Sequence, residues 1–98
     1  MKNNEKLAGY LNLALRAGTL ILGVDKIRET KHKLYAVLAD TVLAEGSMER
    51  LKRKAEETKT PLYIIEGLSE LLHKENCRAA GIADVNIRNA IKPYLEKE

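Results

Sequence analysis

The sequence has almost no cysteine and no long apolar segment. Cys77 is the only cysteine, which excludes an intramolecular disulfide and is typical of a protein in a reducing compartment. No apolar run approaches the roughly 20 residues that a helix needs to span a bilayer. Residues 1–6 also lack the apolar stretch of a signal peptide. We therefore expect a cytoplasmic protein that does not associate with a membrane.

Aromatic residues are also scarce. Tryptophan and phenylalanine are absent, and four tyrosines are the only aromatic residues. Tyr35 and Tyr63 lie within apolar runs, which favours places in the core. A protein that stacks single-stranded bases on exposed aromatic rings is therefore disfavoured.

The sequence contains none of the common catalytic or cofactor motifs. Neither a P-loop nor a Gly-x-Gly-x-x-Gly fingerprint is present. His32 and His73 are far apart, without cysteines or paired carboxylates at metal-ligand spacing. Cys77 has no recognisable base or oxyanion partner, and we expect it to be a small buried hydrophobe. These observations predict a protein with no catalytic residues, no metal, no cofactor and no small-molecule substrate.

Length and charge set the class of protein. The 98 residues are enough for one domain with a single core, which we place at 1–98. Apolar residues make up 45% of the chain, and charged residues at 32% exceed the usual share of about 25%. The formal charge of +3 and the pI of about 9.0 permit contact with a polyanion but do not demonstrate it.

Hydrophobic periodicity predicts helices that alternate with short strands. Helices are expected over 4–17, 24–31, 47–58, 69–74 and 84–93, and strands over 20–22, 34–39, 61–65 and 78–82. Alternation of this kind predicts an α/β fold, a three-layer α/β/α sandwich around a four-stranded sheet. The very short first strand leaves open whether the sheet is mixed or all parallel.

Particular residues are expected to mark the ends of these helices. Asn3 or Asn4 is expected to cap the first helix, Ser47 the third and Asp84 the last. Pro93 is expected to end or kink the last helix, because it lacks an amide donor and clashes with the preceding turn.

Two glycines enclose the first expected strand. Gly18 is expected to follow the first helix directly, because glycine tolerates positive φ. Gly23 opens the second helix, where the amides of Gly23 and Val24 are expected to approach phosphates or base edges. This pattern points toward nucleic acid.

Four segments together resemble a known family. They are 15–20 with Gly23, 35–40, 61–65 and 80–84. In this order and spacing, the chain is similar over nearly its full length to the L7Ae/L30e ribosomal-protein superfamily, and most of all to its small bacterial YlxQ-like members. The resemblance implies an α/β/α sandwich that binds structured RNA, typically a kink-turn or ribosomal RNA, and that associates with ribosomes.

The resemblance also implies that RNA binds at the start of the second helix and at the loops after the second and third strands. In this sequence those positions are Gly23, Val24, Asp25, Lys26, Asp40, Thr41, Glu66, Gly67, Leu68 and Ser69. Leu68 is expected to pack beneath an extruded nucleotide. Lys31, in the basic run 31–33, either contacts the phosphate backbone or lies at a solvated helix end.

The second helix departs from the RNA-reading pattern of the superfamily, Gly-x-Asn-Glu-x-x-Lys. This chain has Asp25, Lys26 and Glu29 at the three polar positions, so the order of charges is inverted. Leu71 and Leu72 likewise stand where the superfamily has Leu-Gly. Two functions therefore stay open: a non-catalytic RNA-binding protein, which we favour, and a protein-interaction module that kept the fold but lost RNA recognition.

Overall fold

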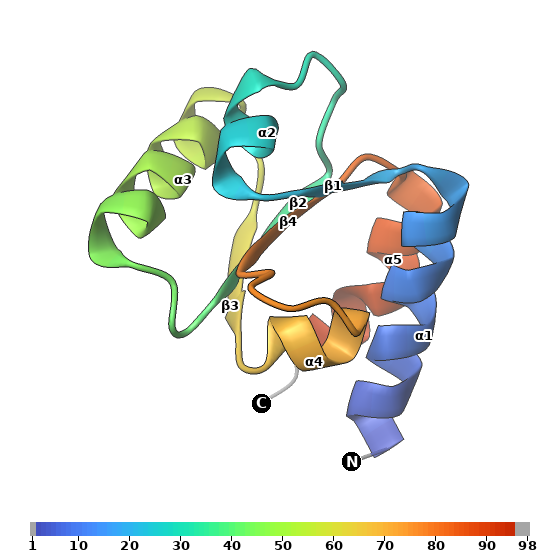
Figure 1. Ribbon diagram of the computed structural model, residues 1–98. Helices are drawn as coiled ribbons and strands as arrows, with labels where there is room; N and C mark the ends of the chain where they lie inside the picture. Colours follow the sequence, from blue (N-terminus) through green and yellow to red (C-terminus); the bar gives the residue numbers. More distant parts are fainter. Residues whose placement is uncertain (1, 96–98) are drawn as a thin grey trace.

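A computed structural model describes the backbone of residues 2–95 and the side chains of residues 5–95. Within these residues, five helices alternate with four strands (Figure 1). The strands are β1 (Leu20–Leu22), β2 (Ala36–Asp40), β3 (Leu62–Ile65) and β4 (Ala79–Ile82). The helices are α1 (Lys2–Ala17), α2 (Val24–Glu29), α3 (Glu45–Glu57), α4 (Leu68–Leu72) and α5 (Val85–Leu95).

The strands form one mixed sheet in the order β1-β4-β2-β3. β2 and β3 are parallel, with Leu38 opposite Tyr63, whereas β4 is antiparallel to its neighbours β1 and β2. The predicted four-stranded α/β sandwich is therefore confirmed, and the sheet is mixed. The carboxyl ends of β1, β2 and β3 and the beginning of β4 consequently lie at the same end of the sheet.

Helices cover both faces of this sheet (Figure 1). α1, α4 and α5 pack on one face, where Leu11 and Leu38 belong to the same core cluster. α2 and α3 pack on the other face, where Ile27 and Leu51 form a second cluster with Val37. All five residues of β2 are buried, as a continuous apolar run predicts for a strand that is covered on both faces.

Two predicted helix ends are confirmed. Gly18 has a φ of 79° and its amide donates to the Leu15 carbonyl at 3.2 Å, while the Thr19 amide donates to the Ala14 carbonyl at 2.9 Å. This pair of bonds is a Schellman motif, which turns the chain from α1 into β1. Asp84 caps α5, since its Oδ1 accepts an amide of the first turn at 2.8 Å.

The predicted start of α3 is wrong. The helix begins at Glu45 with Ala44 at the N-cap position, so Ser47 lies inside its first turn. The Leu43 amide donates to the Asp40 carbonyl at 3.0 Å, which closes a tight turn directly after β2. Because this turn is complete so early, the chain enters the helix before it reaches the serine.

The other differences are small. α1 begins at Lys2, so Asn3 and Asn4 lie within the helix rather than before it, and their side chains are outside the described residues. β2 begins two residues later than predicted, and α2 ends at Glu29. α5 continues past Pro93 to residue 95, so the proline does not end the helix. Pro93 is exposed, and water can therefore hydrate the carbonyl that loses its donor.

Candidate nucleic-acid interface

The three segments that were expected to bind RNA begin at one end of the sheet. β1, β2 and β3 run in the same direction, so the start of α2 and the loops after β2 and β3 all follow carboxyl ends of strands. The start of β4 joins the ends of β1 and β2: the Gly23 amide donates to the Ala79 carbonyl at 3.0 Å, and the Asp40 amide donates to the Arg78 carbonyl at 2.9 Å. We call this surface the carboxyl end of the sheet.

The junction of β1 and α2 depends on a glycine. Gly23 has a φ of 96°, a conformation that other residues adopt at a steric cost. Its amide is engaged by the Ala79 carbonyl, so the prediction that this amide approaches a phosphate is wrong. Val24 is half-buried against the second core cluster, whereas Asp25 and Lys26 are exposed. At its beginning, α2 therefore exposes the side chains of Asp25 and Lys26 to solvent.

Asp40 is a structural carboxylate and does not face solvent. It is only 4% exposed, so the predicted contact between its side chain and RNA is wrong. Its Oδ1 accepts the Val42 amide at 3.2 Å and the Thr41 hydroxyl at 3.3 Å, and its Oδ2 accepts the Leu68 amide at 2.9 Å. Burial raises the pKa of the Asp40 carboxyl, but the hydrogen bonds that it accepts bring the pKa below its usual value. The carboxylate therefore joins the loop after β2 to the start of α4.

The segment after β3 supplies fewer exposed groups than predicted. Leu68 is 0% exposed and lies in the first core cluster, so it cannot pack beneath a nucleotide. The Ser69 hydroxyl donates to the Cys77 carbonyl at 2.8 Å and accepts the Cys77 amide at 2.9 Å, which fastens α4 to the segment before β4. Glu66 is exposed, and Gly67 is half-buried with a φ of 77°.

Lys31 lies apart from the other predicted contacts. It belongs to the connection between α2 and β2, which leads to the opposite end of the sheet, where β2 begins. The side chain of Lys31 is exposed, and the Lys33 ammonium that follows lies 5.4 Å from the centre of the Tyr35 ring. This basic run is therefore separate from the carboxyl end of the sheet.

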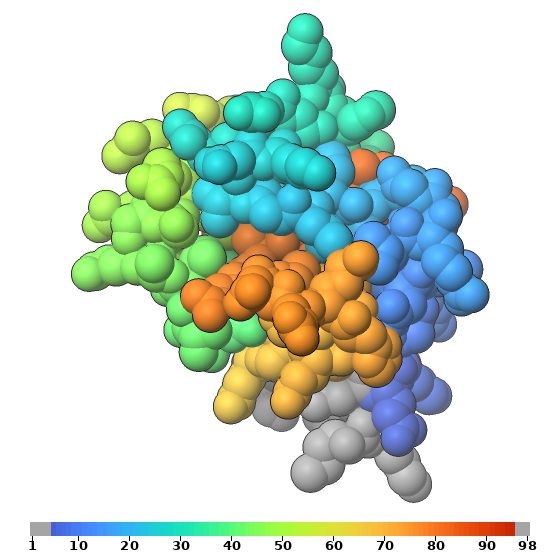
Figure 2. All heavy atoms as spheres, in the orientation of Figure 1, coloured from blue at the N-terminus to red at the C-terminus, as the bar shows by residue number. Residues whose placement is uncertain are grey.

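The structure adds a segment that the sequence did not single out. Residues 73–78 connect α4 to β4 and, in orange in Figure 2, occupy the middle of this face, between the surfaces of β1–α2 and α4. Lys74 and Arg78 are exposed there. His73 and Asn76 have φ values of 56° and 59°, so the chain turns twice within six residues. The one signal for this segment in the sequence is that a basic residue lies two positions before Asn76, at Lys74, and two positions after it, at Arg78.

One exposed apolar side chain accompanies these polar groups. Val42, in the loop after β2, is 63% exposed, and its backbone is held by the bond from its amide to Asp40. An exposed valine next to a fixed backbone offers an apolar contact surface. Neighbouring Thr41 is also exposed and donates its hydroxyl hydrogen to Asp40.

The exposed charges at the carboxyl end of the sheet balance. Segments 23–26, 41–42, 66–67 and 73–78 contain three exposed basic and three exposed acidic residues, which are Lys26, Lys74, Arg78, Asp25, Glu66 and Glu75. This surface therefore offers individual charged partners to a polyanion without a net attraction of its own.

Other kinds of site were sought in the described part of the chain. No helix there is long and apolar enough to cross a membrane. Among the same residues, no three His, Cys, Asp or Glu side chains gather in a way that could hold a metal ion. Cys77 is buried, and burial raises the pKa of its thiol.

Comparisons with known proteins bear on the fold. A comparison with protein-family models finds no match, and a comparison with curated proteins finds none either. A solved structure described as "The structure of a protein with unknown function from Bacillus halodurans C" superposes with a TM-score of 0.85 and 16% sequence identity. The match covers 95% of this chain and 99% of the other. At this identity the likeness shows a shared fold alone.

Proposed function

We propose that this protein is a non-catalytic RNA-binding protein that recognises a kink-turn or another structured RNA with the carboxyl end of its sheet. The observation that carries the proposal is the convergence of the start of α2 and the loops after β2 and β3 on one surface. These are the elements that the resemblance to the L7Ae/L30e superfamily implies for RNA binding. A ribosomal or other structured RNA in the cytoplasm is the corresponding partner.

The contacts are assigned to the groups that the fold leaves exposed. Lys26, Lys74 and Arg78 reach phosphates, and Asp25 accepts hydrogen bonds from the amino groups of bases. Val42 takes the role that Leu68 cannot have, because its exposed side chain can pack against an unstacked nucleotide. Asp40 acts behind this surface by holding the loop that carries Val42.

Titration of a labelled kink-turn RNA tests the proposal, with a continuous duplex of the same length as the competitor. We expect tighter binding of the kink-turn and a loss of affinity with added salt. Val42→Ala removes two methyl groups from the contact, so binding of the kink-turn should weaken by about 1–2 kcal/mol, or roughly tenfold. Leu13→Ala is the matched control, because Leu13 is 50% exposed on α1, away from the carboxyl end of the sheet.

Equal affinity for the kink-turn and the duplex would refute recognition of a kink-turn. A capture experiment before and after nuclease treatment then distinguishes the remaining function. Partners that survive nuclease treatment would support a protein-interaction module, which the inverted charges at Asp25, Lys26 and Glu29 leave open.

A further inference from the structure

A basic cleft lies between α2 and α3, on the face of the sheet opposite to α1. It has a volume of about 280 Å³ and is lined by Arg28, Glu29, Arg50, Arg53, Lys54 and Glu57. Four cations against two carboxylates give the cleft a net charge of +2. Neither the sequence motifs nor the resemblance assigns a role to this cleft.

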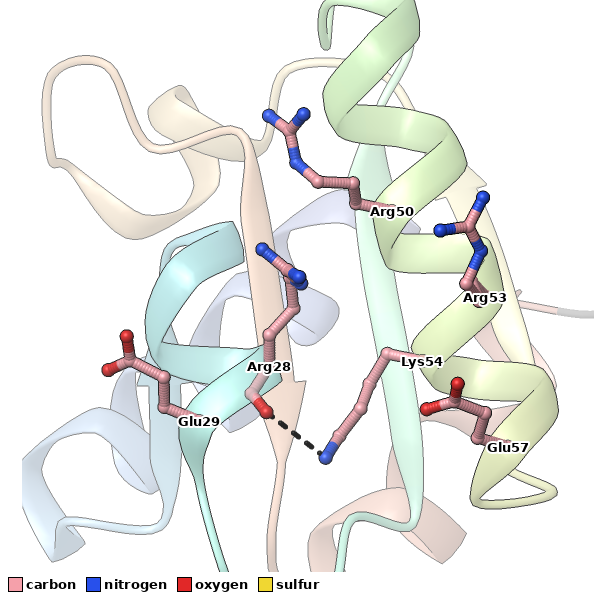
Figure 3. A pocket seen from close by; sticks show the side chains of 6 residues that line it. All are labelled: Arg28, Glu29, Arg50, Arg53, Lys54 and Glu57. Atoms are coloured by element: carbon pink, nitrogen blue, oxygen red, sulfur yellow. Dashed lines mark hydrogen bonds between the residues drawn. The ribbon is translucent and has the colours of Figure 1, made fainter.

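Two arginines at the cleft have no counterion among the residues whose side chains the structure describes. Figure 3 shows Arg28 and Arg50 extending toward the end of the cleft at which both helices begin, whereas Glu29 points away from it. Among the described residues, no ion pair joins either guanidinium to a carboxylate. Within residues 5–95, Arg50 donates only to the Ser47 hydroxyl, at 3.3 Å. Arg28 belongs to α2 and Arg50 to α3, so two like charges lie on opposite walls of the cleft, and an anion bound between them relieves their repulsion.

A hydrogen bond from Lys54 joins the two helices that form the cleft. The Lys54 ammonium donates to the Arg28 carbonyl at 3.2 Å, so it connects the last turn of α2 to α3 (Figure 3). A cation at the C-terminal end of a helix is also favoured by the helix dipole. This bond uses the backbone of Arg28 and leaves its guanidinium available to a ligand.

The two helices that form the cleft both begin at the proposed RNA surface. α2 follows the carboxyl end of β1 and α3 follows that of β2, so both helices begin at the carboxyl end of the sheet. Arg28 is four residues beyond Val24, which is about 6 Å along a helix. A strand of RNA on the carboxyl end of the sheet therefore needs little further length to place a phosphate between Arg28 and Arg50.

We infer that the cleft between α2 and α3 binds a backbone phosphate of the RNA through Arg28 and Arg50. This inference rests on the proposed function and adds the charge that it lacks, because the carboxyl end of the sheet has no net charge while the cleft is positive. Phosphate contacts supply much of the affinity of proteins for nucleic acids. Arginine suits the role, since its planar guanidinium pairs with two phosphate oxygens at once.

The test compares salt dependence in a double variant and a matched control. Arg28→Gln with Arg50→Gln removes both contacts, and Lys52→Gln with Lys59→Gln removes the same charge at exposed residues outside the cleft. Binding of the labelled kink-turn RNA is measured between about 50 and 200 mM salt. We expect the slope of log K against log salt to decrease in magnitude by about one for each arginine, and hence by about two in the double variant. The control variant should keep nearly the slope of the wild type.

The possible outcomes distinguish a failure of the inference about the cleft from a failure of the proposed function. If the wild type binds the RNA and the double variant has the slope of the control variant, the inference about the cleft is wrong and the proposed function stands. If the wild type binds neither RNA at low salt, both are wrong. Far-UV circular dichroism and thermal unfolding confirm that the variants are folded, as expected for substitutions of exposed side chains.

Discussion

The carboxylate of Asp40 is predicted to be essential for the stability of the carboxyl end of the sheet. Asp40→Ala removes the acceptor of the buried Leu68 amide, at 2.9 Å, and of the Val42 amide, at 3.2 Å. A buried donor without an acceptor costs about 1–3 kcal/mol, whereas the more exposed Val42 amide regains water. We expect the free energy of unfolding to fall by about 2 kcal/mol and Tm to fall by roughly 8–16 °C.

Asparagine is not expected to replace this aspartate. Asp40→Asn keeps the shape of the side chain but changes one acceptor oxygen into an NH₂ donor. Whichever way the amide is turned, this donor faces the amide of Val42 or that of Leu68, because the two carboxylate oxygens accept from opposite segments. Asp40→Asn should therefore also be less stable than the wild type at neutral pH.

The pH dependence of this effect has a definite sign. Burial raises the pKa of the Asp40 carboxyl, but its hydrogen bonds lower it further, so the pKa in the folded state is below that in the unfolded state. Such a carboxyl stabilises the folded state above the unfolded pKa, about 4, and this stabilisation is lost as the pH falls through the folded pKa. The difference in stability between the wild type and Asp40→Asn should be complete at about pH 7 and shrink below about pH 4.

Urea unfolding followed by far-UV circular dichroism measures these effects. Asp25→Ala is the matched control, because Asp25 is exposed in the first turn of α2 and should contribute less than about 1 kcal/mol. Equal loss of stability in Asp40→Ala and Asp25→Ala, or an Asp40→Asn variant as stable as the wild type at neutral pH, would refute the reasoning.

Two further predictions concern the core. A Cβ added at Gly81 would lie 3.2 Å from Leu34 Cδ2 and 3.3 Å from Ile27 Cγ1, so Gly81→Ala should lower the free energy of unfolding by about 1–3 kcal/mol. Gly9→Ala is its control in urea unfolding: a Cβ there meets nothing within 4 Å, and helical alanine should stabilise α1, so equal effects would contradict the prediction. Cys77 is 8% exposed and its pKa is raised by burial, so an aromatic disulfide reagent should label the native thiol far more slowly than the urea-unfolded thiol. Equal labelling rates would contradict this burial.

The order of helices and strands was predictable because local signals coincide with the tertiary structure. Gly18 and Gly23 occupy left-handed or otherwise positive φ values at the two ends of β1, and a continuous apolar run marks the buried strand β2. The N-terminal end of α3 was not predictable from Ser47, although serine is a favourable N-cap residue. The turn between Leu43 and Asp40 decides where this helix begins, and a favourable N-cap residue further along does not override it.

The candidate site was predictable as a set of segments but not as a set of side chains. The direction of β1, β2 and β3 brings the segments to one end, and this follows from the topology. Leu68 lies in the first core cluster, and Asp40 accepts the amide of Leu68, which is 28 residues further along the chain. No local pattern in the sequence reveals either contact. Lys74 and Arg78 enter the surface because Ser69 holds the chain around Cys77, which is again a contact between distant residues.

The residues that shape the carboxyl end of the sheet are different from those that face solvent there. Asp40 and Ser69 point inward and engage backbone groups, while Lys26, Val42 and Arg78 point outward. A designer can consequently vary the outward set in a combinatorial library without disturbing the inward set. The same small scaffold can then be selected for binding to new targets, with each variant supported by an unchanged framework.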